Sequence, residues 1–203
     1  GNEEEIGAAS ANGNTLEFEI APYSMKTYLV RLAKPQAPAA LASAPVKLPY
    51  NMKTASFNAF KAEVNFDGKG NAYAAELLPE TLTFKGVDFK LNDPALANGM
   101  KCRQDTIALP AGNYNKLYLL AAATRHDTQC TFTVGGKSQD VVVPYYGGFI
   151  GQWGHTGHTE EFLKAADIAF VGTHKHSMVY NKDLAYDYAY MFCIPLDIPA
   201  GAE

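Results

Sequence analysis

The sequence has little of what would place it in a membrane, on nucleic acid or in a disulfide framework. It contains no run of 18 apolar residues, so we expect no membrane-spanning helix and no membrane partner. Its formal net charge is −4, which does not favour a polyanion, so we expect no nucleic acid partner. Its three cysteines, Cys102, Cys130 and Cys193, form no Cys-x-x-Cys pair, and we expect small buried side chains. A Cys102–Cys130 bridge stays open for an exported chain.

The motifs of autonomous enzymes are also missing. There is no Gly-x-Ser-x-Gly elbow, Walker loop or Gly-x-Gly-x-x-Gly turn. A carboxylate pair for glycoside hydrolysis cannot be chosen among 21 Asp and Glu residues by sequence alone. We therefore predict no catalytic residues and no cofactor in this chain. The acidic start shows no signal peptide and leaves the compartment unknown, with the periplasm or secretion slightly favoured over the cytoplasm.

What the sequence does have is aromatic residues and frequent turn signals. Aromatics make up 12% of the chain, and Tyr and Phe suit half-buried strands. Short β-rich runs between Gly-containing turns lie at residues 81–84, 87–91, 117–120 and 131–134. They predict an all-β fold, an antiparallel β-sandwich, with the small residues 121–123 near the centre of the core. One short helix is predicted over residues 160–166.

The chain divides into three predicted parts. Residues 1–34 read as the closing strands of a preceding β domain or as an N-terminal arm, with Leu16, Phe18 and Ile20 alternating along one strand. Residues 35–45, rich in Pro and Ala, form a linker. Residues 46–203 are then the β-sandwich domain.

Four of the five histidines fall close together in the sequence. His155 and His158 have the spacing His-x-x-His, and His174 and His176 have the spacing His-x-His, which puts both rings on one face of a strand. Neutral imidazoles bind zinc well, and acids for such a site would be Asp167, Glu160 and Glu161. Locally hydrogen-bonded polar residues explain the same pattern, so we assign no metal and keep the histidines as weak candidates.

Two further features concern ligands. Residues 67–71 (Asp-Gly-Lys-Gly-Asn) lack the alternating acids of a calcium loop, so they predict a plain turn. Trp153, Tyr145 and Tyr146 lie among glycines, where aromatic rings could stack on sugar or pack in the core. Tyr186, Tyr188 and Tyr190 alternate, which predicts a strand with one aromatic face.

Several short motifs occur in the order in which one family carries them. They are Leu48–Asn51, Phe66–Gly70, Ala75–Pro79, Gly86–Phe89, Cys102–Arg103, Thr106–Pro110, Asn113–Ala122, Phe149–Trp153, Thr173–His176 and Leu196–Gly201. In these the chain resembles the C-terminal β-sandwich region of family-38 glycoside hydrolases, the α-mannosidases. The resemblance implies a galactose-binding-like jelly roll over residues 46–201.

The resemblance also implies a role. In that family the nucleophilic Asp and the metal ligands belong to an N-terminal α/β domain that has no counterpart here, so the family's metal cannot be carried over to His174 or His176. We expect a non-catalytic C-terminal module whose partners are the catalytic domain of a parent protein and, at its surface, glycan. Two alternatives stay open. One is a free-standing carbohydrate-binding protein that uses Trp153, Tyr145, Tyr146, His174 and His176, and the other is a small metal-dependent hydrolase built on the histidines.

Overall fold

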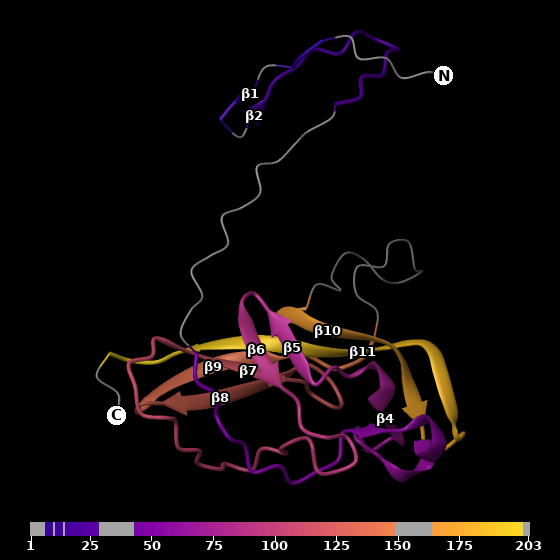
Figure 1. The fold of residues 1–203 in the computed structure, drawn as a ribbon, viewed down its shortest axis with the longest axis vertical. Coiled ribbons are helices and arrows are strands. Elements are labelled where there is room, and N and C mark those ends of the chain that lie inside the picture. Colours follow the sequence, from indigo (N-terminus) through magenta and orange to yellow (C-terminus); the bar gives the residue numbers. More distant parts are fainter. Residues whose placement is uncertain (1–6, 10, 14, 29–42, 149–163, 201–203) are drawn as a thin grey trace. The chain divides into compact units, whose positions relative to one another are not determined.

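A computed structural model describes residues 7–9, 11–13, 15–28, 43–148 and 164–200 of the chain (Figure 1). The chain separates into two compact units, Gly1–Ala39 and Ala40–Glu203. In the first unit, β1 (Ala11–Asn12) and β2 (Thr15–Leu16) form a two-stranded antiparallel hairpin. Of the predicted linker over residues 35–45, only residues 43–45 lie within the described part of the chain, and they form no helix or strand.

The strand predicted through Leu16, Phe18 and Ile20 was wrong beyond Leu16. Residues 17–28 form no strand, and the side chains of Phe18 and Ile20 are 50% and 51% exposed. Alternation stabilises a strand only when its apolar face is covered. Among the described residues of this unit, the ring of Phe18 packs tilted against that of Tyr28, at 4.7 Å between centroids.

The second unit is built on a five-stranded sheet, whose strands are ordered β3-β4-β10-β11-β7. These strands are β3 (Ala55–Ser56), β4 (Asn71–Ala74), β7 (Lys116–Ala121), β10 (Asp167–Ser177) and β11 (Lys182–Asp197). Neighbouring strands pair antiparallel, as predicted, except β3 and β4, which pair parallel at one edge of the sheet. β10 and β11 form the long hairpin that runs through the sheet (Figure 1).

The remaining elements are short. They are the 3-10 helices η1 (Asn58–Glu63) and η2 (Ala75–Leu77), and the strands β5 (Thr81–Phe84), β6 (Val87–Lys90), β8 (Thr128–Val134) and β9 (Lys137–Val143). β5 pairs with β6, and β8 pairs with β9. Both hairpins turn through two residues with positive φ, Lys85-Gly86 and Gly135-Gly136, as tight hairpins require. The strands predicted at residues 81–84, 117–120 and 131–134 are confirmed, and the one predicted at 87–91 is confirmed up to residue 90.

The core lies in two clusters of buried side chains. In one, the β8–β9 hairpin packs on β7 and on the C-terminal half of β11, through residues such as Val143, Ile194 and Leu196. In the other, Tyr73, Tyr146 and Ala189 are buried. The alanine run 121–123 contributes to both clusters, with Ala122 in the second, which fits its predicted place near the core.

Several further predictions were wrong. Cys102 is exposed, so its predicted burial was wrong. Cys193 is buried as predicted, and all three thiols are free. Of the helix predicted over residues 160–166, residues 160–163 lie outside the described part of the chain, and residues 164–166 are not helical. Tyr186 does not share one aromatic face with its neighbours, because β10 and β11 slip register between Gly172 and His174 and leave it 78% exposed with φ 63°. A bulge of this kind breaks the two-residue alternation.

Over the described residues, no helix has the length and apolar character needed to cross a membrane.

Candidate functional site

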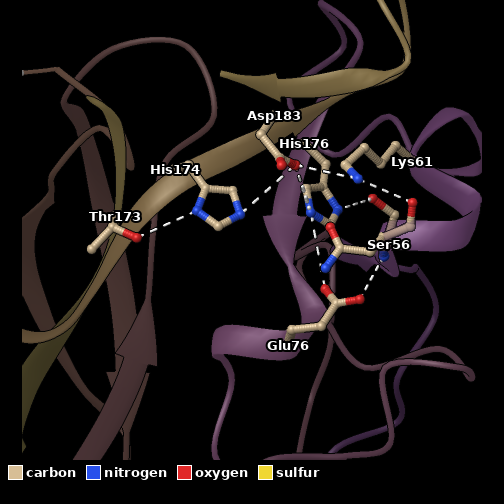
Figure 2. A network of polar contacts seen from close by, with 8 residues as sticks. Ser56, Lys61, Glu76, Thr173, His174, His176 and Asp183 are labelled. Atoms are coloured by element: carbon tan, nitrogen blue, oxygen red, sulfur yellow. Dashed lines mark hydrogen bonds and ion pairs between the residues drawn. The ribbon is translucent and has the colours of Figure 1, made fainter. Parts of the chain in front are cut away.

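Three side chains that could bind a metal ion converge at the end of the long hairpin (Figure 2). His174 and His176 lie two residues apart on β10, so both point to one face of the strand. Asp183 lies on β11 directly opposite His176 in the pairing register. We call His174, His176 and Asp183 the histidine cluster. One ligand atom from each residue lies within 4.8 Å of the others.

The distances within the cluster are short. His176 Nε2 lies 3.3 Å and His174 Nε2 lies 3.8 Å from the same carboxylate oxygen, Oδ1 of Asp183. The two imidazole rings are 5.6 Å apart between centroids and tilted by 36°. The ring nitrogens thus approach one oxygen from two sides.

His176 is the buried member of the cluster, with an exposed fraction of 0%. Its Nδ1 forms a 3.0 Å hydrogen bond with Oγ of Ser56 on β3, while its Nε2 has no hydrogen-bond partner among the described residues. Burial lowers the pKa of the His176 imidazole, and the carboxylates of Asp183 and Glu76 offset this only in part.

Two charged residues flank the cluster. Glu76 on η2 accepts a hydrogen bond of 2.5 Å from the Asn58 backbone N–H through Oε1, and its Oε2 lies 3.9 Å from His176 Nε2. Lys61 on η1 places Nζ 3.4 Å from Oδ1 of Asp183 and donates a 3.0 Å hydrogen bond to the Asn58 carbonyl. The cluster is therefore faced by a second carboxylate and by one ammonium group (Figure 2).

Tyr146, a sequence candidate for stacking on sugar, is a core residue. It is 0% exposed, and its ring packs edge-on against Tyr73 and Phe66. Its hydroxyl donates a 2.8 Å hydrogen bond to Oδ2 of Asp67. A ring enclosed in this way offers no face to a sugar, so Tyr146 is excluded as a stacking platform.

Asp67 anchors the turn predicted at residues 67–71. Its Oδ1 accepts hydrogen bonds from the backbone N–H groups of Lys69 and Asn71, and its Oδ2 accepts one from Nδ2 of Asn71 in addition to Tyr146. Burial acts to raise the pKa of Asp67, but these hydrogen bonds, led by those from Asn71, outweigh it and leave the pKa lowered. Both carboxylate oxygens therefore accept hydrogen bonds from other residues of the domain.

Tyr145 is half-buried, and two ammonium groups lie near its ring. Nζ of Lys164 and Nζ of Lys175 each lie 5.8 Å from the ring centroid. Lys175 is itself buried and pairs with Asp187 at 2.6 Å. Part of the Tyr145 ring is therefore engaged by cations.

The structure brings together only some of the predicted site residues. His174 and His176 lie side by side, whereas Trp153, His155, His158, Glu160 and Glu161 lie outside the described residues. Asp167, the remaining acid expected near the histidines, pairs instead with Lys85 at 2.5 Å.

Sequence reasoning missed Asp183 and Glu76. The signal for Asp183 was a turn around Asn181 between two β-rich runs, because a hairpin there sets Asp183 opposite His176. Glu76 reaches the site from η2, the 3-10 helix after β4. No local sequence pattern predicts this helix.

The histidine cluster and both core clusters fall within one family match. A model of the AziU2-like beta-sandwich domain matches residues 42–203. The chain belongs to this family. The AziU2-like domain thus includes Ser56, Glu76 and the whole β10–β11 hairpin, so the histidine cluster is part of the domain. Comparison with curated proteins finds no match.

Proposed function

We propose that this AziU2-like domain is a non-catalytic β-sandwich module of an α-mannosidase-like glycoside hydrolase. It would act by packing against a separate catalytic domain and by shaping the surface that faces the glycan. The observation that carries the proposal is the hydrogen bonding of Asp67, which has the one buried carboxylate among the described residues. Both its oxygens accept hydrogen bonds from the fold.

Glycoside hydrolysis needs two free carboxyl groups that face each other across a sugar. They stand about 5–5.5 Å apart in retaining enzymes and about 6.5–9.5 Å apart in inverting ones. Asp67 contacts Tyr146 and Asn71 instead and serves the core. This use of its buried acid supports the proposed non-catalytic role of the domain.

The ordered motifs favour the α-mannosidase-like parent and the galactose-binding-like jelly roll. They fall on structural landmarks of the domain: the Asp67 turn, strand β7 and the His174–His176 stretch of β10.

Exposed apolar side chains on the β10–β11 hairpin support packing against another domain. Val171, Val179, Tyr180 and Tyr186 are 51%, 63%, 67% and 78% exposed. Because contiguous exposed apolar patches mark interaction surfaces, we place the contact with another domain on this hairpin.

Two measurements test the proposal. The purified chain should not hydrolyse aryl α-mannosides, and turnover that is retained through purification and lost in the Asp183→Asn variant would contradict a non-catalytic role. The reading frame upstream of Gly1 tests the parent. An α/β domain with acidic and histidine residues is expected there, and a frame that encodes a different domain contradicts the α-mannosidase-like parent.

A second candidate is a free-standing carbohydrate-binding protein, favoured by one observation. The bulge in β11 holds the Tyr186 ring 78% exposed, and an exposed ring can stack on the apolar face of a sugar. Calorimetric titration with methyl α-mannoside tests it on the native chain and on Tyr186→Ala and Trp153→Ala variants. Saturable binding that either variant weakens favours this candidate, and absence of heat removes it.

A further inference from the structure

The geometry points to a structural zinc site formed by His174, His176 and Asp183, with Glu76 as the fourth ligand. This site lies outside the role proposed above and does not depend on it. Its ligand atoms already converge, since those of His174, His176 and Asp183 lie within 4.8 Å of one another. Two imidazoles with carboxylates suit zinc, whereas magnesium and calcium prefer oxygen ligands alone.

The distances fit the coordination of zinc. Ligand atoms about 2.0–2.2 Å from a tetrahedral ion stand about 3.3 Å from each other. His176 Nε2 and Asp183 Oδ1 are 3.3 Å apart, and His174 Nε2 is 3.8 Å from the same oxygen. These two distances are therefore close to the separation of ligand atoms in a tetrahedral zinc site.

A second, independent observation is the unpartnered nitrogen of His176. This ring is fully buried, and its Nε2 lacks a hydrogen-bond partner among the described residues while it faces two carboxylates. When Nδ1–H donates to Ser56 Oγ, the unprotonated Nε2 lies 3.3 Å from Oδ1 of Asp183 and 3.9 Å from Oε2 of Glu76. An unprotonated ring nitrogen this close to two carboxylate oxygens is repelled by them unless a cation lies between the three atoms.

Ser56 supplies the support that metal-binding histidines use. Its Oγ lies 3.0 Å from Nδ1 of His176, and such a bond fixes the ring and the tautomer that leaves Nε2 free for a metal. Glu76 is held in a similar way, because Asn58 N–H binds its Oε1 and leaves Oε2 directed at His176. An ion here would join η2 to the β10–β11 hairpin.

Lys61 is the competitor for the site. Its Nζ lies 3.4 Å from Oδ1 of Asp183 and its side chain is 14% exposed, so the ammonium supplies the positive charge in the metal-free state. The ion must displace it, and replacement of Lys61 by Met should therefore tighten zinc binding.

Zinc titration of the full chain tests the site. Isothermal calorimetry with Zn²⁺ alone should give one ion per chain, and Co²⁺ should give the intense visible absorption of a tetrahedral centre. His174→Ala and Asp183→Asn should each weaken binding by at least about tenfold, and Glu76→Gln should also weaken it. His174 and Asp183 side chains are 24% and 46% exposed, so these variants should fold, which circular dichroism checks.

The matched control is His126→Ala, which removes an exposed histidine whose Nδ1 contacts the carbonyl of its neighbour Asp127 and no residue of the histidine cluster. It should leave zinc affinity and the cobalt spectrum unchanged. The proposal is overturned if the native chain binds no zinc, or if binding survives in both His174→Ala and Asp183→Asn. It is also overturned if Lys61→Met weakens binding.

Discussion

The hydroxyl of Tyr146 donates a 2.8 Å hydrogen bond to Oδ2 of Asp67, a residue 79 positions earlier in the chain. Both side chains are buried, with exposed fractions of 0% and 3%. This bond ties the turn before β4 to the segment after β9, so it connects two parts of the domain that share no strand pairing.

Replacement of Tyr146 by Phe should destabilise the domain. The variant keeps the ring packing but leaves a buried carboxylate with one donor fewer, which costs about 1–3 kcal/mol. Urea unfolding should measure the loss. Tyr180→Phe, at an exposed ring, is the control and should change the free energy of unfolding little. Equal effects of the two variants would contradict a special role for the Tyr146 hydroxyl.

Acid should weaken the fold partly through Asp67. Its pKa in the folded state is lowered from 3.8, so its contribution is fully present above the pKa of the unfolded chain. That contribution is lost as the pH falls through the lowered folded pKa. Urea unfolding over about pH 2–6 should show a smaller drop in stability at acid pH for Asp67→Asn than for the native chain. Parallel pH profiles of the two proteins would contradict this prediction.

A cavity in the cluster between the β8–β9 hairpin and β11 should lower the free energy of unfolding. Leu196 is 1% exposed and packs in that cluster, so Leu196→Ala should cost about 2–5 kcal/mol. Leu96 is 59% exposed, and the same chemical change there should cost little. Thermal melts that rank the two variants in the opposite order would show that the two layers do not pack as described.

The Lys175–Asp187 pair should respond unequally to loss of its two members. The Lys175 side chain is 3% exposed and that of Asp187 is 42% exposed. Asp187→Ala leaves a buried ammonium without its carboxylate, whereas Lys175→Met removes the buried charge and keeps much of the apolar stem. We expect Asp187→Ala to lower the melting temperature more than Lys175→Met does. The reverse order would mean that the carboxylate, rather than the ammonium, bears the cost of burial.

Local pattern predicted those parts of the fold that local chemistry decides. The hairpin turns at Lys85-Gly86 and Gly135-Gly136 need positive φ, and their strands alternate in burial, so both could be read from the sequence. The sequence through Phe18 and Ile20 shows the same alternation of apolar and polar residues. It failed because nothing in the described part of that unit covers their face.

The site could be predicted only in part for the same reason. His-x-His on a strand places His174 and His176 together, which depends on local geometry alone. Asp183 depends on hairpin register, and Glu76 depends on the parallel β3–β4 edge and its 3-10 helix. Tyr146 was misjudged because burial of its ring depends on Tyr73 and Phe66, which lie more than seventy residues away.

The place of β4 in the sheet has a consequence for synthesis and folding. β4 pairs with β10, about a hundred residues later in the chain, and β10 in turn pairs with β11. During translation β4 can therefore pair only with the two-residue β3 until β10 has been synthesised. Pairings between residues so distant in sequence make folding slow, and the domain should acquire its central sheet only after release of its last strand.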